Sequence, residues 1–162
     1  MRNGDSSKNN NFAKTIPLDQ RHLKACIDLD NIALNGLWTQ GQWEKELNNK
    51  EKLCLGIMKN RDLLAFVCGW LIIDEIHITA IAVHPQYRKK GLAKTLLKTL
   101  LAKAKAKGSK LATLEVSSKN SAAKALYKSV GFITKGNRPC YYKNGSDALI
   151  QWYSLNKEKN LD

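Results

Sequence analysis

A short basic turn between an apolar segment and a helical one is the part of this sequence best suited to chemistry. Segment 76–83 is apolar, and Arg88-Lys89-Lys90-Gly91-Leu92-Ala93 then leads into a helical pattern. A glycine and a small residue at a helix start let backbone N–H groups converge on an anion, and the helix dipole adds to the attraction. The basic side chains favour the same ligand. The turn predicts a phosphate or pyrophosphate site, with a plain solvated helix start as the alternative.

Two further residues have the chemistry of an acid and a base. In the strand-like segment 111–117, Thr113, Glu115 and Ser117 share one face, so the carboxylate need not enter the core. A carboxylate acting through water could take a proton from an α-amine, whose pKa is about 8. Tyr127 lies on the apolar stripe of a helical segment. A surface charge and a core tyrosine are the alternatives for these two residues.

The periodicity predicts a mixed sheet with helices on its faces, an α/β arrangement. The fourth strand, an almost unbroken apolar run, has the pattern of a strand buried on both faces. We expect a loose tail over residues 1–11, a single domain over 12–155 and a second tail over 156–162. The expected elements are strands at 12–16, 52–58, 63–73, 76–83, 111–117, 131–142 and 147–155, and helices from 17 to 34, at 39–48, 90–107 and 120–130.

Composition narrows the class of protein. The 27 basic residues outnumber the 14 acidic ones for a net charge of +13, which favours phosphate-rich or acidic partners. Most of the basic residues are lysines, which argues against a nucleic-acid reader that relies on arginine. No apolar run is long enough to cross a bilayer, and the polar start lacks the apolar core of a signal peptide. We therefore expect a cytoplasmic protein with no membrane partner.

The cysteines and histidines suggest neither a metal site nor a thiol nucleophile. They are widely spaced and lack the short pairs that zinc or redox chemistry uses. We expect four buried, reduced thiols, no metal, and a structural role for His84, which borders the basic turn. The residues concerned are Cys26, Cys54, Cys68 and Cys140, with His22, His77 and His84.

Several motifs, in order, resemble the GNAT acetyltransferase superfamily, and most closely the bacterial ribosomal-protein-alanine N-terminal acetyltransferases. The likeness covers residues 15–153. It implies a GNAT-like fold, with a central twisted, mostly antiparallel sheet, helices on both faces and middle strands that splay apart. The motifs are the R-x-x-G-x-A turn at 88–93, Ile81-Ala82-Val83-His84-Pro85 before it, and Leu114-Glu115-Val116, Asn120, Ala125-Leu126-Tyr127 and Gly131-Phe132 after it.

This resemblance implies a role for each motif. Asn120 would reach the arm of acetyl-CoA, Glu115 would be the general base, and Tyr127 would protonate the departing thiolate. The amine would attack the thioester directly, without a covalent enzyme intermediate. The backbone of Ile81, Ala82 and Val83 would pair with the pantetheine arm, and the turn of Arg88, Lys89, Lys90, Gly91, Leu92, Ala93 and Lys94 would hold the pyrophosphate.

The acceptor side follows from the same resemblance. Trp38, Trp43, Tyr141 and Asp147 resemble the positions that shape the peptide slot of N-terminal acetyltransferases, while aromatic residues that complete a core are the alternative. The expected acceptor is a protein N-terminus, alanine of a ribosomal protein in particular. A lysine side chain, a polyamine or an antibiotic is the second enzymatic interpretation. A basic module that binds ribosomal RNA is the alternative from another class, although the lysine-rich stretch 88–110 lacks interleaved aromatics.

Overall fold

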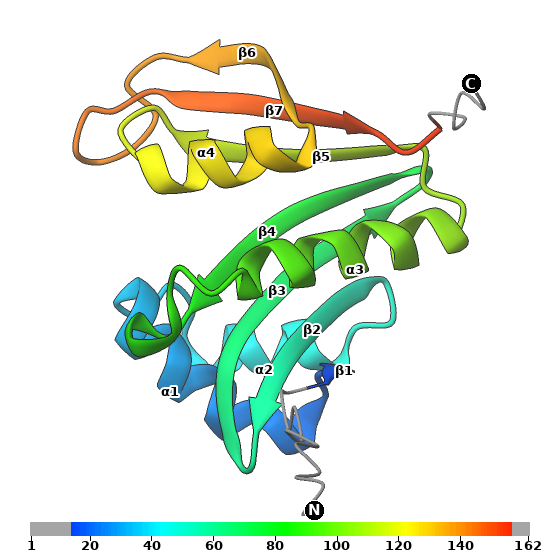
Figure 1. Ribbon diagram of the computed structural model, residues 1–162, viewed down its shortest axis with the longest axis vertical. Coiled ribbons are helices and arrows are strands. Elements are labelled where there is room, and N and C mark those ends of the chain that lie inside the picture. Colours follow the sequence, from blue (N-terminus) through cyan, green and yellow to red (C-terminus); the bar gives the residue numbers. More distant parts are fainter. Residues whose placement is uncertain (1–13, 157–162) are drawn as a thin grey trace, which may run out of the picture.

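The computed structural model describes residues 14–156 and folds them around a seven-stranded sheet in the order β1-β2-β3-β4-β5-β7-β6 (Figure 1). Only β4 and β5 pair in parallel, and every other neighbouring pair is antiparallel. The predicted mixed, mostly antiparallel sheet is therefore confirmed. The strands are β1 (Thr15–Pro17), β2 (Lys52–Lys59), β3 (Asp62–Ile72), β4 (Glu75–Val83), β5 (Leu111–Ser117), β6 (Ile133–Arg138) and β7 (Ala148–Ser154).

The sheet opens between β4 and β5. These two strands pair only at Glu75↔Leu111, Ile76↔Ala112 and His77↔Thr113, and then diverge. Figure 1 shows the resulting splay, with β1 to β4 forming one arm and β5, β7 and β6 the other. The predicted splay of the middle strands is confirmed, and it leaves one edge of β4 and one of β5 without a partner strand.

Helices cover both faces of the sheet, and each face has its own apolar core beneath its helices. α3 (Leu92–Ala106) and α4 (Ser121–Val130) lie on one face, while α1 (Leu23–Leu34) and α2 (Gln40–Asn48) lie on the other (Figure 1). The predicted stripe of α3 is buried in the first core. Its leucines and alanine at helical spacing fix the helix across β2, β3 and β4. These buried residues are Leu96, Leu97, Leu100, Leu101 and Ala104.

A β-bulge at Thr79 changes the face that β4 presents. Before the bulge, Ile76 and Ile78 belong to the core under α3, whereas after it Ala80 and Ala82 belong to the core under α1 and α2. One extra residue in a strand exchanges its two faces. Beyond the bulge the strand is covered on both faces, as predicted, because Ile81 and Val83 pack, partly buried, against the core under α3. Before the bulge only the face of Ile76 and Ile78 lies in a core, so the prediction was wrong for that stretch.

The ends of the first two helices follow their capping residues. A 3-10 turn (Gln20–His22) precedes α1, and Asp19 caps it by accepting from the Arg21 backbone N–H at 3.0 Å. Thr39, the first residue of the predicted second helix, caps α2 and accepts from the Gln42 N–H at 3.2 Å. The expected first helix from residue 17 is therefore a short 3-10 turn followed by α1.

The C-terminal hairpin is shorter than predicted. β6 ends at Arg138 instead of continuing to residue 142, and Cys140 has a left-handed backbone with φ of 52° that breaks the strand. Cys140 is also exposed, which corrects the prediction of four buried thiols, while Cys26, Cys54 and Cys68 are buried as expected. The predicted tail at 1–11, the start of the first strand at Phe12, and all but the first residue of the predicted tail at 156–162 lie outside the described residues.

Across residues 14–156, none of the helices has both the length and the apolar character needed to span a bilayer.

Candidate active site

A groove of about 780 Å³ runs along the open edge of β4 to the starts of α3 and α4. We call it the α3–α4 groove. Of the residues predicted to hold the cofactor, only Lys90 does not line it; its ammonium instead lies 5.3 Å from the centroid of the Tyr87 ring. The structure thus gathers the others around one cavity: Ile81, Ala82, Val83, Arg88, Lys89, Gly91, Leu92, Ala93, Lys94 and Asn120.

The turn before α3 presents bare backbone N–H groups to this groove. Lys89 and Gly91 both have left-handed backbones, with φ of 61° and 79°. Thr95 donates the first N–H that finds a carbonyl of its own helix, Gly91 O at 3.0 Å, and Gly91 provides no side-chain cap. The N–H groups of Leu92, Ala93 and Lys94 therefore have no partner within the helix. Together with the helix dipole they form an anion site.

The groove walls combine an unpaired strand edge with a helix cap. Beyond His77, β4 has no neighbour on the β5 side, so its backbone over residues 81–83 can pair with an extended ligand. Arg88 Nε donates to the Val83 carbonyl at 3.4 Å and ties the turn to this strand. Asn120 Oδ1 caps α4 by accepting from the Ala123 N–H at 3.1 Å, which leaves its NH₂ group free to donate.

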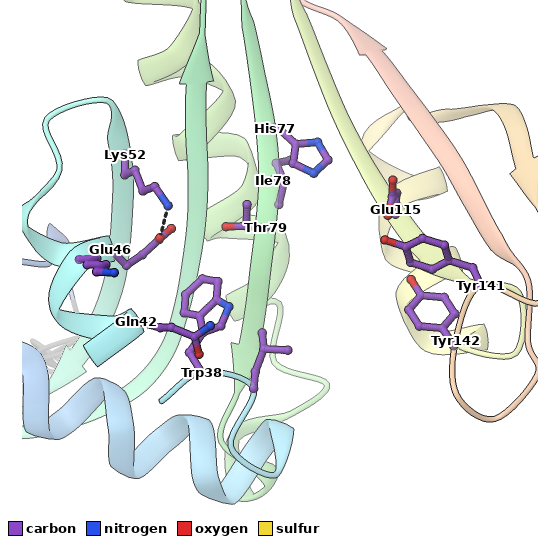
Figure 2. A pocket seen from close by; sticks show the side chains of 12 residues that line it. Trp38, Gln42, Glu46, Lys52, His77, Ile78, Thr79, Glu115, Tyr141 and Tyr142 are labelled. Atoms are coloured by element: carbon purple, nitrogen blue, oxygen red, sulfur yellow. Dashed lines mark hydrogen bonds and ion pairs between the residues drawn. The ribbon is translucent and has the colours of Figure 1, made fainter. Parts of the chain in front are cut away.

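A second cavity, of about 470 Å³, lies on the face covered by α1 and α2. We call it the Glu115 pocket. Figure 2 shows Trp38, Gln42, Glu46 and Lys52 on one side, His77 and Thr79 on β4 in the middle, and Glu115, Tyr141 and Tyr142 on the other side. Three of these come from predicted site positions, and the pocket spans the splay between β4 and β5.

Glu115 projects into the pocket from β5, as its strand alternation predicts. Its side chain is 23% exposed, and Oε1 lies 3.2 Å from Arg138 Nη1. Arg138 in turn lies over the Tyr141 ring, 5.7 Å from its centroid. Burial raises the pKa of Tyr142, and the Glu115 carboxylate raises it further. The carboxylate therefore has one cation and two phenols around it, and its role as a base stays a prediction.

Tyr127 lies in the core under α3 and α4, and it lines neither cavity. Its ring packs 5.8 Å from that of Phe132. Burial raises the pKa of Tyr127 to about 12, and Tyr142 contributes to the rise. The phenol is therefore protonated at neutral pH, which a proton donor requires. Its catalytic role remains a prediction.

Trp43 does not contact the pocket, which corrects its assignment as a substrate residue. It is fully buried, and its indole Nε1 donates to Asp30 Oδ2 at 2.8 Å. Its ring meets Trp38 edge to face at 4.8 Å. Trp38 is partly exposed and does line the pocket. Trp43 thus packs behind Trp38 as part of the core.

Asp147 does not line the pocket, but it forms hydrogen bonds within the loop whose tyrosines do. Its carboxylate accepts from the Cys140 backbone N–H at 2.9 Å and from Asn137 Nδ2 at 3.2 Å. These bonds lower the pKa of the carboxyl. They clamp the two ends of the β6–β7 loop that carries Tyr141 and Tyr142. The part of Asp147 in substrate binding stays a prediction.

Several pocket residues were not among the predicted site residues. Gln42, Lys45 and Glu46 face the pocket from α2, and His77 faces it from β4, where its Nδ1 lies 3.0 Å from Thr113 Oγ1. The α2 residues share one helix face at i, i+3 and i+4 spacing, a signal that the sequence does contain. His84 has the structural role expected of it, since its Nδ1 accepts from the Gln86 N–H at 3.1 Å.

The sequence is similar to a known protein family and to individual members of it. The acetyltransferase (GNAT) family model matches residues 23–132. The chain is 36% identical over 141 residues to the [ribosomal protein bS18]-alanine N-acetyltransferase of Escherichia coli K12, covering 82% of this chain and 91% of the relative.

Solved structures agree in fold. The crystal structure of the ribosomal-protein-S18-alanine N-acetyltransferase from Escherichia coli matches with a TM-score of 0.82 and 28% identity, covering 92% of this chain and 98% of the other. Arabidopsis thaliana NAA60 in complex with acetyl-CoA has the same fold, with a TM-score of 0.78 at 16% identity over 89% of this chain and 99% of the other. From the family match, the E. coli relative and the shared fold, the chain belongs to the GNAT family of acetyltransferases.

Proposed function

We propose that this acetyltransferase uses acetyl-CoA to acetylate the N-terminal α-amine of a protein, and that the acceptor residue is alanine of a ribosomal protein. The observation that carries the proposal is the pair of cavities, which are lined by adjoining stretches of β4, residues 77–79 and 81–83, where β4 and β5 separate. The relative from E. coli acts on ribosomal protein bS18, according to its name.

The α3–α4 groove suits the coenzyme. Its bare N–H groups at the start of α3 and the side chains of Arg88 and Lys89 would bind the pyrophosphate. The unpaired edge of β4 would bind the pantetheine arm as an added strand does, through backbone hydrogen bonds. Because that edge faces the splay, a thioester at the end of the arm would reach towards the Glu115 pocket.

The Glu115 pocket suits the acceptor amine. An α-amine must lose its proton before it attacks a thioester, and Glu115 is the carboxylate on the β5 side of the splay. It would take that proton through water, and the amine would then form its bond to the acetyl carbon as the sulfur leaves. Trp38, Tyr141 and Tyr142 would enclose the first residues of the peptide, so that much of the rate comes from positioning.

Tyr127 would donate a proton, or a hydrogen bond, to the departing thiolate. Its support is that its phenol is protonated at neutral pH and that Tyr142 is close enough to influence its pKa. The phenol to compare with Tyr127 is that of Tyr142, because Tyr142 lines the Glu115 pocket and Tyr127 does not. Slower acetyl transfer in Tyr127→Phe, with an unchanged KM for the peptide, would support the assignment, and wild-type kcat would contradict it.

A panel of acceptors tests the proposed function. Purified protein with acetyl-CoA should release CoA with a peptide that begins with Ala, and mass spectrometry should place the acetyl group on the α-amine. The same peptide with a blocked N-terminus and a free lysine, spermidine, and an aminoglycoside are the competing acceptors. Faster transfer to any of them would overturn the N-terminal proposal. Salt-sensitive binding to ribosomal RNA without any transfer would instead favour the binding module.

A further inference from the structure

Three potential metal ligands meet in the core beneath α2, at the side of the Glu115 pocket opposite Glu115. Cys54 and Cys68 are directly opposite each other on the antiparallel strands β2 and β3, and Glu46 packs over them from α2. Their two sulfur atoms and a carboxylate oxygen lie within 4.8 Å of one another, and all three residues are buried. Their positions in the sequence show no metal-binding spacing, which is why the sequence predicted no such cluster.

One atom of this cluster is unexplained by the protein alone. Among the buried side-chain oxygens and nitrogens of the described part of the chain, Glu46 Oε1 is the only one without a hydrogen-bond partner. The other oxygen, Oε2, pairs with Lys52 Nζ at 2.5 Å. A buried carboxylate oxygen without a partner is unfavourable, so a group that ligates it would be stabilised at this position.

The charges around the cluster suit a divalent cation. Two thiolates and one carboxylate around such a cation leave one net negative charge, and the ammonium of Lys52 on Glu46 Oε2 balances it. A buried ionic cluster is tolerated when its charges are paired in this way. Two thiolates and one carboxylate are also ligands that zinc accepts.

We propose that Cys54, Cys68 and Glu46 form a binding site for a thiophilic divalent cation of the Zn²⁺ class. Binding replaces two S–H bonds with two metal–sulfur bonds, and both protons pass to solvent. Metal–sulfur bonds of about 2.3 Å place tetrahedral sulfur ligands about 3.8 Å apart, so atoms that lie within 4.8 Å of one another have to approach by at most about 1 Å. The fourth position is left to a water molecule.

The site would link two parts of the protein. β2 and β3 carry the thiols, while α2 carries Glu46 together with Gln42 and Lys45, which line the Glu115 pocket. Since Glu46 itself lines that pocket, the pocket is the side from which a cation reaches the cluster. Occupancy would therefore fix α2 against the sheet and raise the thermal stability of the chain.

A cadmium titration of the reduced full-length chain tests the site. The parent for this experiment is Cys140→Ser, because Cys140 is an exposed thiol far from the cluster in sequence. Cd²⁺ should produce a thiolate-to-metal ultraviolet absorption band that saturates at about one equivalent, and Zn²⁺ should displace it. The thermal midpoint should rise with the metal. No band at one equivalent, or a band that titrates without a break, would overturn the proposal whatever the variants do.

The cysteines of the same core provide the matched variants. Cys68→Ser should abolish the band. Cys54→Ala should abolish it as well, so that the test can still be made if one of the two variants does not fold. Cys26→Ser removes a third buried thiol of that core without removing a proposed ligand, and it should keep the band. Circular dichroism checks the fold of each variant. An unchanged band in both Cys68→Ser and Cys54→Ala, or its loss in folded Cys26→Ser, would contradict the assignment.

Discussion

The α3–α4 groove is built largely from backbone, whereas the Glu115 pocket is built from side chains. The groove takes its polar groups from the free N–H groups of α3 and the open edge of β4. The pocket takes its polar groups from Glu115, His77, Glu46 and residues of the β6–β7 loop. A backbone site accepts many substitutions outside a few glycines, while a side-chain site changes with each residue. The two regions should therefore respond to mutation in different ways.

The largest expected effect is on the Glu115 pocket. Glu115→Gln keeps the shape of the side chain and removes its basicity, so kcat should fall by about 10²- to 10⁴-fold. The affinity for acetyl-CoA should remain within about twofold, because the groove is untouched. Steady-state kinetics measures kcat, and calorimetric titration measures the affinity for acetyl-CoA. Glu75→Gln, an exposed carboxylate at the start of β4, is the control and should leave both unchanged.

The next largest effect is expected for a change in the backbone of the α3–α4 groove. Gly91→Ala places a side chain at φ of 79°, where no neighbouring atom lies within 4 Å of the new Cβ, so the change is conformational and not steric. A non-glycine residue there costs about 1–2 kcal/mol. Relaxation of the turn should weaken acetyl-CoA binding roughly tenfold, as measured by calorimetry.

Gly108→Ala is the matched control at the other end of α3. Its φ is 96°, and its new Cβ would likewise meet no atom within 4 Å. It should lower the free energy of unfolding by a similar amount without changing the affinity for acetyl-CoA. Equal losses of affinity in both variants would mean that the turn before α3 is no anion site.

A smaller effect separates the wall of the pocket from the core behind it. Trp38→Ala should raise the KM for an acceptor peptide roughly fivefold and change stability little, because Trp38 is partly exposed. Trp43→Ala should instead lower the free energy of unfolding by about 3–5 kcal/mol, because it empties a core position. Peptide kinetics and chemical denaturation of the two variants measure the contrast. A KM effect for Trp43→Phe, with unchanged stability, would restore it as a substrate residue.

The smallest effect is a pH dependence at the β6–β7 loop. The folded pKa of Asp147 is lower than its ordinary value, so its carboxylate stabilises the fold above that ordinary value and loses this contribution as pH falls through the folded pKa. The free energy of unfolding of the wild type should therefore decline more steeply below about pH 4 than that of Asp147→Asn. Denaturation from pH 7 to pH 3 measures this. Parallel curves would show that the loop does not depend on the charge.

Local patterns explain why the groove was predictable. Its residues come from two short stretches, 81–94 and 120–129, together with the end of α1. The strand, turn and helix start follow one another in the chain, so the apolar run, Gly91 and the lysines reveal their geometry directly. Thr39 and Asn120 likewise marked two helix starts, because capping is a local interaction.

The pocket was only partly predictable because distant elements assemble it. Strand alternation placed Glu115 on the polar face of its strand and the family resemblance gave it its role, but Arg138, its ion-pair partner, lies on another strand. Trp43 and Asp147 have residue types that suit a binding slot, yet the fold places Trp43 in the core and uses Asp147 to hold a loop. The bulge at Thr79 was also hidden, since an apolar run does not show where its face changes.

The central claim is that the groove and the pocket are two halves of one reaction site, joined through the splay between β4 and β5. A conjugate in which an Ala-starting peptide is linked through its α-amine and an acetyl spacer to the sulfur of CoA tests this directly. Calorimetry should show the conjugate binding about 10²- to 10⁴-fold more tightly than CoA, and kinetics should show it competing with both substrates. Binding no tighter than CoA, or competition with acetyl-CoA alone, would contradict the account.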